Sequence, residues 1–180
     1  SETFSQNNIS CSIAESLQRF TQLMSMAREH DIPVRGYLSC VLGCPYEGDV
    51  TPSTVAQLTA QLLDMGCFEV SLGDTIGTGN AGSMSLLLDE LLQQFSPNQL
   101  AIHCHDTYGQ ALSNILVALQ AGISTIDSSV AGLGGGPYAP GASGTVATED
   151  VVYLLDGRSI NTGLALDALL SPGAHVSAPL

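Results

Sequence analysis

Residues 100–122 read LAIHCHDTYGQALSNILVALQAG. The opening run, residues 100–105, is apolar apart from two histidines and has no regular polar alternation, which predicts a parallel strand buried on both faces. Residues 107–121 predict a helix, and Gly122 is the kind of residue that commonly ends one. The stretch therefore predicts one strand–helix unit whose strand ends in polar side chains.

The same unit recurs on both sides of this stretch. Ser12 and Glu15 form a capping-box pattern that predicts the start of a helix, and Thr51 followed by Pro52 predicts the start of another. The alternation of strands and helices is typical of the α/β class. We predict further strands at residues 34–41, 68–72 and 123–130, and further helices at residues 52–65, 81–95, 148–155 and 165–170.

Two architectures fit four such units. They are half of an eight-stranded (β/α)8 barrel of the TIM type, or they are a complete small doubly wound sheet. No G-x-G-x-x-G pattern follows the first strand, which disfavours a dinucleotide-binding fold. We expect residues 1–180 to form a single partial barrel domain, in which residues 156–180 are a C-terminal extension that is loosely ordered at its end.

The composition excludes several classes of protein. The chain has 180 residues, a net charge of −13 and no lysine, which argues against nucleic acids and anionic membranes as partners. The hydrophobic content of 44% argues against disorder. No apolar run approaches the ~20 residues of a membrane span, and residues 1–10 show no signal-peptide pattern. Five cysteines, an odd number, suit a reducing compartment better than a disulfide framework.

Polar residues gather where the predicted strands end, the edge at which parallel sheets carry active sites. Asp74 follows the strand at 68–72, and Asp127 lies late in the strand at 123–130. His103 and His105 end the strand at 100–105, and side chains two apart on a strand point to the same side. Two imidazoles so placed can bind one cation, although two packed, hydrogen-bonded histidines would give the same pattern.

Other candidates are weaker when taken singly. Asp74 is a candidate base or a partner for a histidine, or else a turn residue. A buried Arg35 needs an anionic partner, for which Glu149, Asp150 or a substrate carboxylate could serve, although a structural ion pair is the more common role. Cys40 and Cys44 are expected to be core cysteines, because no second cysteine pair completes a zinc site.

The glycine-rich loop is a further feature without a unique interpretation. Residues 132–137 read GLGGGP, a run that could bring backbone amides close to an anion or form a flexible lid. The pattern matches neither a P-loop nor a dinucleotide-binding loop.

Four long segments give the chain a specific resemblance. They are VRGYLSCVLGCPYEG at 34–48, SLGDTIG at 71–77, HCHDTYGQAL at 103–112 and DSSVAGLGG at 127–135. In this order they resemble the 3-hydroxy-3-methylglutaryl-CoA (HMG-CoA) lyase family, and the match runs from the first residues to about residue 166. The H-x-H motif alone would indicate only the wider group of metal-dependent aldol-type lyases and synthases.

This resemblance implies a (β/α)8 barrel that holds a divalent cation, Mg²⁺ or Mn²⁺. It implies cleavage of HMG-CoA to acetoacetate and acetyl-CoA, as in leucine degradation and ketone-body formation, with HMG-CoA or a related acyl-CoA as the partner. A homodimer is expected, or else a need for the missing first half of the barrel. The expected location is cytoplasmic, with the mitochondrial matrix as the alternative.

The resemblance also implies roles for single residues. His103 and His105 match the two metal-binding histidines of the family, and His103 also matches its acid/base histidine. Further matches and candidates for the catalytic set are Asp74, Arg35, Tyr37, Ser71 and Glu149.

Three departures from the family pattern matter. The chain is expected to begin about halfway through the barrel, without the first strands and their Arg-Asp pair, whose Asp is a metal ligand. Gly136 stands where the family has a reactive loop cysteine, and Thr145 stands where it has an Asn ligand. Two of four protein ligands remain, and hard cations bind poorly to so sparse a set. The hypotheses are a piece of a longer lyase, or a non-enzymatic relative that acts as a subunit or binding module; either way we expect no cleavage by this chain alone.

Overall fold

Four parallel strands form the centre of the structure, a computed structural model that describes residues 1–135 and 141–176. They are β1 (Arg35–Leu38), β2 (Glu69–Asp74), β3 (Leu100–Cys104) and β4 (Thr125–Asp127). Their order in the sheet is β1-β2-β3-β4, so each strand pairs with the next one along the chain. A doubly wound sheet would reverse its order at a switch point, whereas a barrel keeps it, so the sheet is a barrel segment.

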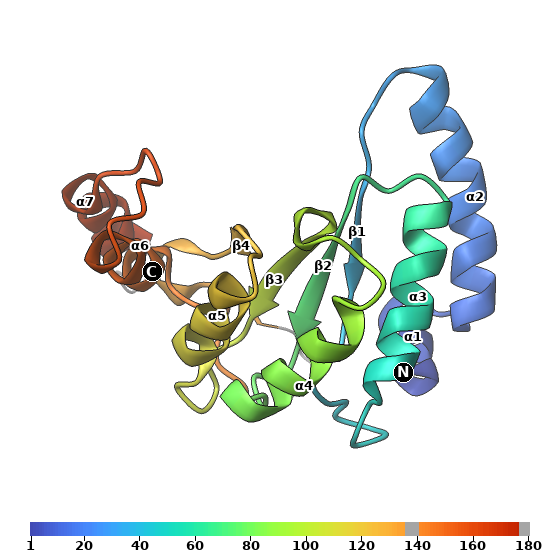
Figure 1. The fold of residues 1–180 in the computed structure, drawn as a ribbon, viewed down its shortest axis with the longest axis horizontal. Helices are drawn as coiled ribbons and strands as arrows, with labels where there is room; N and C mark the ends of the chain where they lie inside the picture. Colours follow the sequence, from blue (N-terminus) through green and yellow to red (C-terminus); the bar gives the residue numbers. More distant parts are fainter. Residues whose placement is uncertain (136–140, 177–180) are drawn as a thin grey trace.

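Helices connect the strands and extend the chain beyond them. Figure 1 shows α3, α4 and α5 following one another along one side of the sheet, with α6 and α7 gathered beyond β4. No helix among the described residues is long and apolar enough to cross a membrane. The helices are α1 (Glu2–Ile9), α2 (Ile13–Glu29), α3 (Pro52–Asp64), α4 (Ala81–Leu91), α5 (Ala111–Gln120), α6 (Thr148–Gly157) and α7 (Leu166–Val176), and short 3-10 turns lie at Pro97–Gln99 and Val130–Gly132.

The helix starts that the local patterns predicted are confirmed. Ser12 caps α2 and exchanges hydrogen bonds with Glu15 in a capping box, and Thr51 caps α3 ahead of Pro52. The helix predicted from residue 107 begins later, at Ala111. The Asp106 carboxylate accepts a hydrogen bond from the Ala111 amide across the intervening turn, so residues 107–110 wrap around an aspartate instead of continuing the helix.

The first helix was not predicted from the sequence. In α1, Ser1 accepts a hydrogen bond from the Phe4 amide, and Phe4 is the helix's buried residue. Because α1 has so few apolar residues, its sequence shows almost no hydrophobic periodicity that would predict a helix. The helix is stabilised by packing against the rest of the fold.

The two faces of the sheet differ sharply. Residues that face the helices are apolar and fully buried, among them Val70, Leu72 and Ile102. The residues between them form rows on the other face, where Tyr37 pairs with Ser71 and His103 pairs with Asp127. The prediction of strands buried on both faces is confirmed for β2 and for all of β3 except His103, whereas the edge strands β1 and β4 are partly exposed.

The sheet ends in two free edges. Among the described residues, β1 pairs only with β2, and β4 pairs only with β3. An eight-stranded barrel closes by pairing such edges with further strands. These edges and the polar face define a half-barrel whose inner surface carries the predicted site.

Leucines two residues apart on α4 allow the core to be tested. Leu88 is 2% exposed and Leu86 is 67% exposed. We expect Leu88→Ala to lower the free energy of unfolding by about 2–5 kcal/mol, because it leaves a cavity between α4 and the sheet. Leu86→Ala should change it by less than about 0.5 kcal/mol. Urea denaturation measures both, and equal effects would contradict the assigned helix face.

Candidate functional site

The candidate site lies at the carboxyl-terminal ends of the strands, on the polar face of the sheet. A cavity of about 220 Å³ opens there. Parallel register brings side chains from different strands into it, since His103 of β3 lies beside Gly73 of β2 and Asp127 of β4. The cavity is lined by Phe4, Asn8, Tyr37, Leu38, Ser39, Gly73, Thr75, His103 and His105.

The two histidines of the H-x-H motif lie side by side, as predicted. Their ring centroids are 5.5 Å apart. His105 Nδ1 lies 3.0 Å from the carbonyl oxygen of Ser143, and His103 Nδ1 lies 3.4 Å from Asp127 Oδ2. Both partners are acceptors, so a hydrogen bond at either contact requires the proton on Nδ1, and a neutral ring would then keep its lone pair on Nε2.

This arrangement suits two ligands of a divalent cation, because metal-binding histidines usually donate their other ring nitrogen to a carbonyl or carboxylate. Within residues 1–135 and 141–176, no third His, Cys, Asp or Glu completes a cluster with them. The histidines therefore fit the cation as a pair, and the remaining ligands must be other groups.

Asp127 is the most connected side chain of the site. Its Oδ1 accepts a hydrogen bond of 2.7 Å from Arg35 Nη1, and its Oδ2 accepts one of 2.8 Å from the Ser71 hydroxyl. Burial alone would raise the pKa of this carboxyl, but hydrogen bonds from His103, Arg35 and Ser71 hold it well below its usual range. The sequence analysis placed Asp127 late in a predicted strand but did not assign it to the site. The signal that could have identified it is that this strand is the next one along the chain after the H-x-H strand.

Arg35 is paired with two carboxylates of the sheet itself. Its Nε lies 2.6 Å from Glu69 Oε1, and its Nη1 contacts both Asp127 and the Tyr37 hydroxyl. Burial would lower the pKa of the guanidinium, but the hydrogen bond and charge of Asp127 raise it overall. The structural ion pair that sequence reasoning allowed for Arg35 is confirmed, with Glu69 and Asp127 as its partners in place of Glu149 or Asp150.

Glu149 lies elsewhere. Its carboxylate accepts a hydrogen bond of 3.0 Å from the Ala131 amide, at the start of the glycine-rich loop. Neither Glu149 nor Asp150 pairs with Arg35, because α6 lies beyond β4 whereas Arg35 is on β1. The described contacts of Glu149 anchor the loop and do not bring it to the two histidines.

Asp74 is on the opposite face of the sheet from His103. It pairs in register with Cys104, whose side chain is buried in the helix-side core. Its Oδ2 accepts a hydrogen bond of 3.0 Å from the Gly79 amide, which fixes the turn before α4. Burial raises the pKa of this carboxyl, and the nearby His105 opposes that shift. Asp74 does not line the cavity of about 220 Å³, but the charge of His105 acts on its carboxyl, so its place in the site stays a prediction.

The remaining predicted residues are near the site in different ways. Tyr37 lies with its ring centroid 6.3 Å from that of His103, and burial together with the charge of Asp127 raises its pKa. Thr145, which stands where the family has an Asn ligand, is bridged through the backbone to His105. Gly136 lies outside the described residues.

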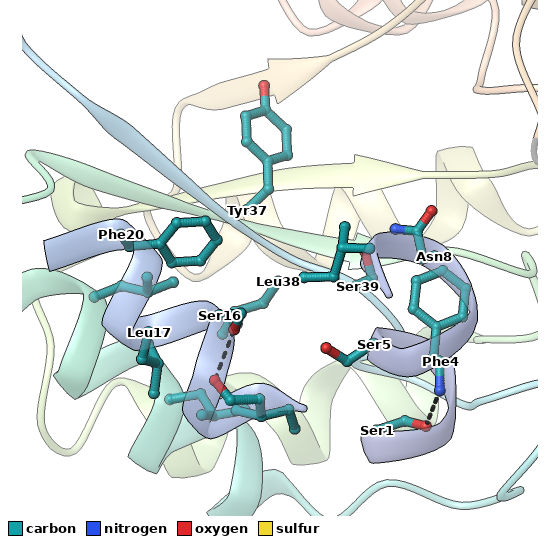
Figure 2. A pocket seen from close by; sticks show the side chains of 14 residues that line it. Ser1, Phe4, Ser5, Asn8, Ser16, Leu17, Phe20, Tyr37, Leu38 and Ser39 are labelled. Atoms are coloured by element: carbon teal, nitrogen blue, oxygen red, sulfur yellow. Dashed lines mark hydrogen bonds between the residues drawn. The ribbon is translucent and has the colours of Figure 1, made fainter. Parts of the chain in front are cut away.

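A second cavity, of about 250 Å³, adjoins the site between α1, α2 and β1. Figure 2 shows Phe20 of α2 at one end, Phe4 and Asn8 of α1 at the other, and Leu38 between them. Phe4, Asn8 and Tyr37 line both cavities, so α1 forms a wall of the site.

The cysteines of the described chain are free and buried. Cys40 and Cys44 pack with Phe4 and Val50 in a small apolar cluster. Burial raises the pKa of Cys40 to about 12, which keeps this thiol protonated at neutral pH. The expectation of core cysteines is confirmed for this pair.

Comparisons with known proteins point in one direction. The family model described as HMGL-like matches residues 1–176. The chain is 57% identical to the cytoplasmic 3-hydroxy-3-methylglutaryl-CoA lyase of Mus musculus, covering 98% of this chain and 51% of that protein. It is 59% identical to the mitochondrial hydroxymethylglutaryl-CoA lyase of Bos taurus, covering 98% and 54%. The chain thus spans about half the length of the curated relatives it matches.

Solved structures agree. The crystal structure of hydroxymethylglutaryl-CoA lyase from Pseudomonas aeruginosa superposes with a TM-score of 0.94 at 54% identity, covering 99% of this chain and 61% of that one. An HMG-CoA lyase from Acinetobacter baumannii, in complex with coenzyme A and 3-methylmalate, superposes with a TM-score of 0.90 at 34% identity, covering 96% and 56%.

The depressed pKa of Asp127 predicts how acid acts on the fold. An aspartate whose folded pKa lies below its unfolded value of about 3.9 stabilises the protein above that value and loses the effect as pH falls through the folded pKa. We expect Asp127→Asn to lower stability by about 1–3 kcal/mol at pH 7, with the deficit shrinking below about pH 4. Urea titrations at several pH values measure it, and a deficit independent of pH would contradict the assignment.

Asp74→Asn is the matched comparison, since it should act with the opposite sign. The raised pKa of Asp74 means that ionisation costs stability as pH rises through the folded pKa. Asparagine keeps an acceptor for the Gly79 amide without the charge. This variant should therefore be at least as stable as the parent at pH 7, and its advantage should vanish in acid.

Proposed function

The chain belongs to the HMGL-like family, and on that premise we propose that the protein containing it cleaves HMG-CoA to acetoacetate and acetyl-CoA. The observation that carries the proposal is the cluster of His103, His105, Arg35 and Asp127 at one end of a half-barrel. In this family fold the carboxyl-terminal ends of the strands hold the active site. The proposed substrate is an acyl-CoA, a thioester of coenzyme A, and the A. baumannii structure is a complex with coenzyme A itself.

The reaction requires a base for the tertiary hydroxyl and stabilisation of the enolate that forms when the carbon–carbon bond breaks. The resemblance gives His103 two roles, cation ligand and acid/base group, and its Nε2 is the ring nitrogen left without a described partner. One lone pair cannot serve both roles at once, so Nε2 of His103 can accept a proton only while it is not bound to a cation. Arg35 supplies positive charge beside His103. Its Nη2 is buried and has no hydrogen-bond partner among the described residues, so a substrate oxygen is its natural acceptor.

Tyr37 and Ser71 line the same face of the sheet. Tyr37 is held by Arg35 and can orient a substrate oxygen, whereas Ser71 is bound to Asp127 and supports the carboxylate. Asp74 acts from the opposite face by fixing the turn to α4, and Glu149 acts by holding the glycine-rich loop.

His103 and His105 would hold a divalent cation, Mg²⁺ or Mn²⁺, through their Nε2 atoms. When bound, such an ion polarises carbonyl and hydroxyl oxygens of the substrate. Thr145, next to His105, offers a weak oxygen ligand. The resemblance assigns a further Asp ligand to the first half of the barrel, outside this chain.

Completion of the barrel is part of the proposal. The free edges of β1 and β4 leave the inner face open, and strands from the first half of the barrel would pair with them and cover it. In a chain without that half, the same edges favour dimerisation or aggregation. The homodimer, the role in leucine degradation and ketone-body formation, and a cytoplasmic or mitochondrial location are proposed on the resemblance.

A non-enzymatic binding module is the less favoured reading. A degenerate relative has no need to keep two histidines with free Nε2 atoms beside a paired arginine, and this chain keeps them. Gly136 and Thr145 remain the two positions that separate the hypotheses.

Activity requires both halves of the barrel. We expect no acetoacetate release from this chain alone, and none from Gly136→Cys with Thr145→Asn, because loss of a positioned acid/base or electrostatic group costs about 10²–10⁴-fold. The same double variant fused to a family first half should release acetoacetate. Activity of the isolated chain would overturn the requirement for the first half, and an inactive fusion that folds would favour the binding module.

Metal binding by the isolated chain should be weak. Mn²⁺ titration followed by calorimetry should show low affinity that His105→Ala abolishes, because one imidazole remains. His30→Ala is the control, since His30 is exposed at the end of α2. Tight binding, or equal loss in both variants, would contradict the two-histidine site.

A further inference from the structure

We propose that Asp127 is a positioning residue that holds His103 in one tautomer, with the proton on Nδ1 and the lone pair on Nε2. The inference rests on the proposed function, in which Nε2 of His103 is the working nitrogen. It assigns a task to a residue that neither the motif nor the resemblance singled out.

The two oxygens of Asp127 face different partners. Oδ1 is bound to Arg35, 2.7 Å away, and Oδ2 is bound to Ser71 and His103, at 2.8 and 3.4 Å. Arg35 can only donate, so Oδ1 must remain an acceptor. This split prevents the carboxylate from turning away from the imidazole without breaking its ion pair.

The partners come from all four strands. Arg35 lies on β1, Ser71 on β2, His103 on β3 and Asp127 on β4, separated by up to 92 residues along the chain. Direct register pairing places His103 beside Asp127. Because the sheet itself sets this spacing, the imidazole has a fixed acceptor before any ligand binds.

A carboxylate has no proton to give at neutral pH, so it selects the imidazole form that donates from Nδ1. Asparagine at the same place would behave differently. Its amide oxygen would stay on Arg35, which requires an acceptor, and its amide group would then face His103 and donate to Nδ1. The proton would move to Nε2, and that nitrogen could neither accept a proton nor bind a cation.

A purely structural role predicts another outcome. If Asp127 only anchors Arg35, its replacement weakens the fold but leaves the tautomer of His103 unaffected, and Arg35→Met has the same consequences as Asp127→Asn. The position of the ring proton therefore separates the two roles, because packing alone does not determine it.

The test uses the chain with ¹⁵N-labelled histidine and records the ring nitrogens by NMR at alkaline pH, where imidazoles are neutral. The chain has 4 histidines, and single His→Gln variants assign them. We expect Nδ1–H at His103 in the parent, in Arg35→Met and in Asp127→Glu, and Nε2–H in Asp127→Asn. Asp150→Asn, which removes an exposed carboxylate on α6, is the charge-matched control and should leave His103 unchanged.

Circular dichroism checks that each variant is folded. Nε2–H at His103 in the parent overturns the proposal by itself, even if Asp127→Asn fails to fold. An unchanged tautomer in folded Asp127→Asn also overturns it, as does a change in Arg35→Met that matches the one in Asp127→Asn. The experiment reads out a proton position and not acetoacetate release. The tautomer proposal can therefore fail while the proposed function holds, and the proposed function can fail while the tautomer proposal holds.

Discussion

The ion pairs of Arg35 are the interaction on which the rest of the site depends. The guanidinium on β1 joins Glu69 on β2 to Asp127 on β4, across the inner face of the sheet. A mostly buried charge of this kind is costly unless its partners neutralise it, so the three side chains must be placed together. When Arg35, Glu69 and Asp127 are paired, the second carboxylate oxygen of Asp127 faces Ser71 and His103. The side chains of the polar face are thereby held in one arrangement.

The strict alternation of side chains along each strand separates the core from the chemistry. On β2, Leu72 packs among the helices while Ser71 and Gly73 face the site. A shift of one residue would move the apolar set into the cavity, so the burial energy of the core also fixes the register of the polar set. The same rule explains why Asp74, next to Gly73, supports the turn to α4 from behind the sheet.

Close backbone contact completes the site from the loop side. A Cβ at Gly144 would lie 1.9 Å from the carbonyl oxygen of Gly132, so only glycine permits the two segments to pass this closely. The contact carries Ser143 to Nδ1 of His105 and Thr145 alongside the same histidine. The described part of the glycine-rich loop thus contributes to the site through close backbone contact.

Local patterns in the sequence determined the α/β class, most helix starts and the pairing of His103 with His105. Capping hydrogen bonds and the period of side chains involve residues only a few positions apart, so they can be read without a structure. The segments that resemble the HMG-CoA lyase family added Arg35, Tyr37 and Ser71 to the predicted site residues.

Only the tertiary structure decided which of these groups meet. The partners of Arg35, the central place of Asp127 and the rear position of Asp74 follow from strand register and sheet curvature, which join residues up to 92 positions apart. The helix α1 likewise exists because of what it packs against, since its own sequence carries little periodic signal. Sequence patterns encode neighbours along the chain, whereas contacts between strands depend on the free energy of the whole fold, and that is why the chemistry of this site became visible only in three dimensions.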